Sequence, residues 1–77
     1  MKNVTVYSTP TCPYCINLKK HLDENDVDYE DVDVTKDRDK AKEIFKKSGH
    51  RSVPITVIGD EIVVGFEKDK IDKLLEL

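Results

Sequence analysis

The chain has 77 residues, with 13 basic against 16 acidic side chains, so its formal net charge is −3. That length predicts one small domain over residues 1–77. The charge balance argues against nucleic acid as the main partner, because binding phosphates requires a clustered excess of Lys and Arg. No apolar run approaches the ~18 residues of a membrane span, and residues 1–7 lack an apolar signal region. We therefore expect a cytoplasmic monomer that does not bind membranes.

Apolar periodicity and turn residues predict the element order βαβαββα. The predicted strands cover residues 4–7, 29–34, 53–58 and 62–64, and the predicted helices cover residues 13–25, 38–48 and a last segment around Ile71 and Leu74. A crossover helix makes the first two strands parallel neighbours. Gly59 and Asp60 form a two-residue turn signal, so the last two strands are expected to pair as an antiparallel hairpin. Helices should cover both faces of the sheet, because the first and third strands are apolar almost throughout.

The first predicted helix has a clear inner and outer face. Cys15, Leu18 and Leu22 recur at helical spacing on the inner face, and Asn17, Lys20 and Asp23 lie on the outer face. In the second helix, the shared face carries Ala41, Ile44, Phe45 and Ser48, and Gly49 is a stop signal.

The only two cysteines are Cys12 and Cys15, separated by Pro13 and Tyr14. Proline is favoured at the first position of a helix, which places Cys12 at the helix entrance and Cys15 one turn further in on the same face. The free N–H groups and positive dipole end of a helix stabilise an anion, and a thiolate is an anion. We therefore expect Cys12 to be the nucleophilic thiolate and Cys15 its resolving partner.

A metal- or cluster-binding module is the alternative interpretation of the two cysteines. Zinc in structural sites takes four protein ligands, and only His21 and His50 are further soft candidates. We expect His21 to point away from Cys12 and assign His50 no role. Redox chemistry is therefore the favoured interpretation, with no bound metal.

The tetrapeptide Cys12-Pro13-Tyr14-Cys15 resembles the glutaredoxin signature, and the element order resembles the minimal thioredoxin fold, a four-stranded mixed sheet flanked by three helices. Ser52, Val53 and Pro54 lie where this superfamily has its cis-proline loop. The resemblance covers the whole chain. It implies a thiol–disulfide oxidoreductase with Pro54 in the cis form.

Other positions depart from the usual glutaredoxin pattern. Thr9 and Pro10 stand where glutaredoxins usually carry a Lys that helps to hold a glutathione carboxylate, and residues 64–67 replace the usual Gly-Gly-Cys-Asp. The stretch 49–54 and the pair Gly65-Phe66 are more similar to the NrdH-type redoxins. Those proteins take electrons from thioredoxin reductase and serve ribonucleotide reductase. The resemblance therefore implies glutathione as co-substrate, with thioredoxin reductase as the alternative donor.

The resemblance also implies a substrate cleft beside the cysteines. Val53 would offer its backbone N–H and C=O to a bound peptide or glutathione, as an added strand does. Tyr14 and Phe66 would form an apolar rim, although Phe66 is slightly more typical of a core residue. Arg51 would hold a carboxylate, with a solvated charge as the alternative. The expected substrate-binding set is Pro13, Tyr14, Arg51, Ser52, Val53, Pro54 and Phe66. The acidic stretch from Asp23 to Asp37 is interpreted as a solvated surface.

Overall fold

The four strands of the protein form one sheet in the order β2-β1-β3-β4. The structure is a computed structural model that describes residues 3–76. Its elements are β1 (Val4–Ser8), α1 (Pro13–Glu24), β2 (Glu30–Asp33), α2 (Arg38–Ser48), β3 (Ile55–Ile58), β4 (Glu61–Val64) and α3 (Lys68–Leu75). The predicted order βαβαββα is confirmed, and the architecture is a thioredoxin-like fold.

Strand directions follow from the connections between the strands. The crossover through α1 makes β1 and β2 parallel, with Val6 opposite Asp31. The short turn at Gly59 and Asp60 makes β3 and β4 antiparallel, with Ile58 opposite Glu61. β1 pairs antiparallel with β3, so the sheet is mixed, as predicted.

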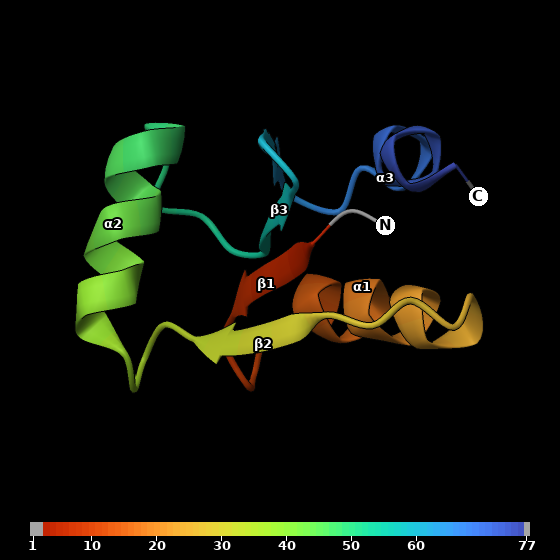
Figure 1. Cartoon of the computed structure of the whole chain (residues 1–77). Coiled ribbons are helices and arrows are strands. Elements are labelled where there is room, and N and C mark those ends of the chain that lie inside the picture. The colour runs from red at the N-terminus through yellow and green to blue at the C-terminus, as the bar shows by residue number, and fades with distance from the viewer. Residues whose placement is uncertain (1–2, 77) are drawn as a thin grey trace.

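Helices lie on both sides of the sheet, with α1 and α3 on one side and α2 on the other (Figure 1). The main core lies between the sheet and the α1–α3 layer, because β1 turns alternate side chains toward those helices. Its fully packed members are Val4, Val6, Leu18, Leu22, Ile58, Val63 and Ile71. The predicted inner face of α1 is confirmed, since Cys15, Leu18 and Leu22 are all buried.

The observed strand limits differ from the predicted ones by one or two residues. β3 begins at Ile55 rather than at residue 53, because the Val53–Pro54 peptide is cis and Pro54 has no N–H for the ladder. β2 is shorter than predicted, although the Val34 N–H still donates to the Ser8 carbonyl at 3.0 Å. β1 extends to Ser8, and β4 begins at Glu61.

Local capping explains the ends of α2. The Asp37 carboxylate accepts a hydrogen bond from the Lys40 N–H at 3.1 Å, which satisfies one of the free donors of the first turn. Gly49 ends the helix with a positive φ of 73° and donates its N–H to Phe45. Within residues 3–76, no helix is long and apolar enough to cross a bilayer.

A hydrogen bond joins the two helices of the main layer. His21 Nε2 of α1 lies 2.6 Å from Asp72 Oδ1 of α3, and both side chains are partly buried. The Phe66 ring packs beside His21, with 6.0 Å between the ring centroids. His21 therefore has a structural partner that the sequence did not reveal.

Candidate active site

Cys12 occupies the entrance of α1, as predicted. It is the N-cap residue in an extended conformation, and Pro13 takes the first helical position. The Cys12 carbonyl accepts the first helical bond from Ile16 at 3.1 Å. This placement directs the free N–H groups of the first turn toward the Cys12 sulfur.

The two thiols occupy different environments. Both are free, Cys12 is half-buried, and Cys15 is 0% exposed. Burial raises the pKa of Cys12, but hydrogen bonds from the Cys15 side chain and from the N–H groups of Cys15 and Tyr14 outweigh it. The pKa of Cys12 therefore lies below the ordinary value of 9.0. The two N–H donors were expected from the sequence, whereas the S–H donor was not.

The pKa of Cys15 is shifted in the opposite direction. Burial is the main cause that raises the pKa of Cys15 to about 11, and the Cys12 sulfur adds to the rise by hydrogen bonding and charge repulsion. A hydrogen bond with the Thr9 backbone and the positive charge of Lys19 both lower the pKa of Cys15, and so oppose this rise. Cys15 therefore stays protonated when Cys12 ionises, and its S–H donates a hydrogen bond to the Cys12 sulfur.

The loop before β3 forms the wall opposite Cys12. The Val53–Pro54 peptide is cis, as the sequence resemblance implied, and Cys12 Sγ lies 3.9 Å from the Val53 carbonyl oxygen. The Gly65 N–H donates to the Pro54 carbonyl at 2.8 Å, which ties this loop to the end of β4. Two segments far apart in the sequence therefore meet at the first cysteine.

The other predicted substrate-binding residues differ in exposure. Tyr14 is 65% exposed beside the cysteines. Pro13, Arg51 and Ser52 are exposed as well. Within residues 3–76, Arg51 forms no ion pair that would occupy its guanidinium. These side chains are free to meet a ligand.

Of the two environments considered for Phe66, the structure shows the core. Its side chain is partly buried and packs against the main core. Its ring also neighbours His21. The core contact is therefore established, and the cleft contact remains a prediction.

Across residues 3–76, no three His, Cys, Asp or Glu side chains come together as a group that could hold a metal ion. His21 is paired with Asp72, and His50 is exposed.

A polar cluster beside Cys15 was missed. Lys19 Nζ donates to Asp31 Oδ2 at 2.8 Å, and the buried Ser8 hydroxyl donates to Asp31 Oδ1 at 2.9 Å. Asp31 belongs to the acidic stretch that was interpreted as solvated surface; its side chain is 46% exposed, in line with that interpretation, and it also accepts these two hydrogen bonds. The four-residue spacing of Cys15 and Lys19 on one helix was the available signal.

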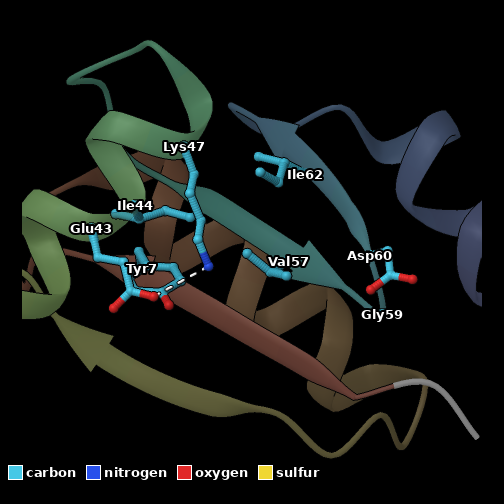
Figure 2. Close-up of a pocket in the computed structure, with 8 residues that line it drawn as sticks. All are labelled: Tyr7, Glu43, Ile44, Lys47, Val57, Gly59, Asp60 and Ile62. Carbon is cyan, nitrogen blue, oxygen red and sulfur yellow. Dashed lines mark ion pairs between the residues drawn. The ribbon is translucent and has the colours of Figure 1, made fainter.

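A separate hollow of about 200 Å³ lies between α2 and the β3–β4 hairpin (Figure 2). It is lined by Tyr7, Glu43, Ile44, Lys47, Val57, Gly59, Asp60 and Ile62. Glu43 and Lys47 form an ion pair of 3.2 Å at its edge. Neither cysteine lines this hollow, so it is not the redox site.

The family model described as glutaredoxin matches residues 4–63. The chain belongs to the glutaredoxin family. Glutaredoxins are thiol–disulfide oxidoreductases, and this protein is an enzyme of that class.

Two curated proteins illustrate the similarity. A glutaredoxin-like 8.6 kDa protein of the rubredoxin operon of Clostridium pasteurianum, described as uncharacterised, is 41% identical over 95% of this chain and 97% of its own length. Glutaredoxin 1 of Rickettsia felis is 38% identical over 99% of this chain and 83% of its own length.

Solved structures of redoxins share the fold. A mutant of the thioredoxin-like protein BC3987 matches with a TM-score of 0.91 and 38% identity over 99% of this chain and 97% of that chain. NrdH-redoxin from Escherichia coli, a glutaredoxin-like protein with a thioredoxin-like activity profile, matches with a TM-score of 0.83 and 28% identity over 94% and 93%. A buckwheat glutaredoxin–glutathione complex matches with a TM-score of 0.80 and 26% identity over 97% and 74%.

Proposed function

We propose that this glutaredoxin-family protein acts by a dithiol mechanism in which Cys12 attacks a substrate disulfide and Cys15 resolves the product. The opposite pKa shifts of the two thiols are the observation that supports this proposal most directly. The pKa of the half-buried Cys12 is lowered, whereas burial raises the pKa of Cys15 to about 11. Only Cys12 combines access with thiolate character, and both are required of an attacking sulfur.

The cycle conserves atoms and electrons at each step. Cys12 thiolate attacks one sulfur of the substrate disulfide, forms a mixed disulfide and releases the other sulfur as a thiolate. Cys15 then loses its proton and attacks the Cys12 sulfur. The substrate leaves as a thiol, and a Cys12–Cys15 disulfide forms. An external reductant returns two electrons and restores both thiols.

The residues around Cys12 form the proposed substrate-binding surface. The backbone of Val53, beside cis Pro54, pairs with an extended substrate segment, and Ser52 and Pro13 flank it. Tyr14 and Phe66 contribute apolar surface to this cleft. The exposed guanidinium of Arg51 binds a substrate carboxylate.

Glutathione is the proposed co-substrate, and glutathione mixed disulfides or protein disulfides are the proposed substrates. The Cys12–Cys15 tetrapeptide and the fold shared with a glutathione-bound glutaredoxin support this choice. No resident cofactor is required, because the electrons pass between sulfurs. The proposed setting is the cytoplasm, where thiols are kept reduced, and the proposed active form is a monomer.

An NrdH-type redoxin is the second candidate, with thioredoxin reductase as the donor and ribonucleotide reductase as a protein substrate. Thr9 and Pro10 replace the lysine that usually contacts glutathione, and Gly65 and Phe66 follow the NrdH pattern. The similarity to NrdH-redoxin supports this alternative.

Donor choice is tested by supplying the oxidised protein with glutathione plus glutathione reductase, or with thioredoxin reductase, and following NADPH consumption. We expect the glutathione arm to support turnover. Turnover only with thioredoxin reductase would favour the second candidate.

The same assay tests the roles of the cysteines. Cys12→Ser should abolish turnover, and Cys15→Ser should accumulate a mixed disulfide that is visible by mass spectrometry. An active Cys12→Ser variant beside an inactive Cys15→Ser variant would reverse the assigned roles.

A further inference from the structure

The dithiol mechanism leaves one requirement open, because Cys15 must become a thiolate in a site where it is 0% exposed. A buried thiol resists ionisation, since the charged form is poorly solvated. Once Cys12 is in a mixed disulfide, it carries no negative charge. The hydrogen bond and repulsion by which Cys12 raises the pKa of Cys15 are then lost, while the opposing effects of Thr9 and Lys19 remain.

Lys19 lies where its charge can act at this stage. It is four residues after Cys15 in α1, so the two side chains lie on neighbouring turns of one helix face. The Lys19 side chain is only 24% exposed, whereas Lys20 next to it is exposed. Partial burial reduces solvent screening of the Lys19 charge.

Two residues of the sheet hold the Lys19 ammonium in place. Asp31 lies opposite Val6, which turns its side chain to the α1 side of the sheet. One carboxylate oxygen of Asp31 accepts from Lys19 Nζ at 2.8 Å, and the other accepts from the Ser8 hydroxyl at 2.9 Å. Asp31 is 46% exposed, but its contact with Ser8, which is only 1% exposed, anchors the carboxylate from its buried side.

We propose that the Lys19 ammonium, anchored through Asp31 and Ser8, favours the thiolate of Cys15 when that residue resolves the mixed disulfide. The proposal rests on the dithiol mechanism described above. Lys19 does not touch the substrate or the reacting sulfurs, so it is a positioning residue that acts through charge.

The other charged groups around Cys15 are accounted for. Among the described residues, Cys12 at the N-cap of α1 and Lys19 within α1 act on its titration, and Asp31 of β2 lies one contact further away. The segments after β1 and before β3 contribute the neutral residues Thr9 and Val53 at the site. Lys19 is therefore the cation that favours a thiolate at Cys15.

The resolving step itself balances without another reactant. Cys15 gives its proton to solvent and attacks the Cys12 sulfur, and the bond between Cys12 and the substrate sulfur breaks. The leaving sulfur takes up a proton, so the substrate is reduced and the cysteine pair is oxidised by two electrons.

A stopped-flow measurement with dithiobis-nitrobenzoate separates the two steps. Attack by Cys12 releases one equivalent of the coloured thiolate, and resolution by Cys15 releases the second. Lys19→Met keeps the aliphatic stem and removes the charge, Lys19→Arg keeps the charge, and Lys20→Met is the matched control on the exposed face.

We expect Lys19→Met to slow the second phase about three- to tenfold at neutral pH, as for a thiol pKa raised by about half to one unit. The first phase should be unchanged, the difference should vanish at alkaline pH, and Lys19→Arg should restore the second phase. An unchanged second phase, equal slowing in Lys20→Met, or slowing that is independent of pH would overturn the role of Lys19. A wild-type protein that releases only one equivalent would instead overturn the dithiol mechanism.

Discussion

The thiol of Cys12 lies 3.9 Å from the carbonyl oxygen of Val53, although 41 positions separate these residues in the chain. The contact joins the start of α1 to the loop before β3, and the bond from Gly65 to Pro54 extends it to the end of β4. Three segments therefore meet at Cys12, the proposed nucleophile.

The Cys15 side chain should contribute to the acidity of Cys12, because it is the first among the hydrogen bonds that lower the pKa of Cys12. Cys15→Ala removes this donor, whereas Cys15→Ser retains a hydroxyl donor at the same place. We expect the pKa of Cys12 to be about one unit higher in the alanine variant than in the serine variant. The pH profile of alkylation by iodoacetamide measures the pKa of Cys12 in each variant. Equal profiles for the two variants would contradict the prediction.

The buried thiol of Cys15 should make the reduced protein less stable at alkaline pH. Its folded pKa is raised from 9.0 to about 11, so its contribution to the free energy of unfolding is complete below pH 9 and is lost as the pH rises toward 11. Urea unfolding of Cys12→Ser should therefore show a greater alkaline loss than Cys12→Ser/Cys15→Ala. Burial is the main cause of the shift and persists without Cys12. Parallel stability curves for the two proteins would refute this.

Gly49 and Gly65 provide a matched pair for the loop that faces Cys12. Both have positive φ angles, and an added Cβ would meet no atom within 4 Å at either position. Each change to Ala should cost about 1 kcal/mol of stability from the backbone alone. Only Gly65 donates its N–H to Pro54. Gly65→Ala should therefore displace that loop and lower kcat/KM about three- to tenfold. Gly49→Ala should leave kcat/KM unchanged. Equal activity losses would argue against the positioning role.

Arg51 should act in binding and not in the chemical step. Arg51→Met should raise the KM for a glutathionylated peptide about fivefold, as for the loss of a charge-assisted hydrogen bond in an exposed site, and leave kcat unchanged. Arg38→Met, at the exposed start of α2, is the control of equal charge change. Steady-state kinetics distinguishes the outcomes, and a KM that matches that of the control would remove Arg51 from the site.

Local sequence signals predicted the parts of the site that lie within one turn of the chain. Pro13 at the first helical position placed Cys12 at the entrance of α1, and the three-residue spacing placed Cys15 on the same face. The turn at Gly59 and Asp60 predicted the β3–β4 hairpin. These features depend on backbone conformations and contacts between near neighbours, which residue type largely determines.

The sequence by itself thus determined the element order, the helix entrance and the placement of the two cysteines on one helix face. Only the tertiary structure decided what surrounds them: the Val53 carbonyl against Cys12, the Ser8–Asp31–Lys19 cluster beside Cys15, and Asp72 against His21. Each of these contacts joins separate elements, and its geometry depends on strand register and helix packing. No local pattern specifies them, because residues far apart in the chain meet only when the sheet assembles and both of its faces are covered.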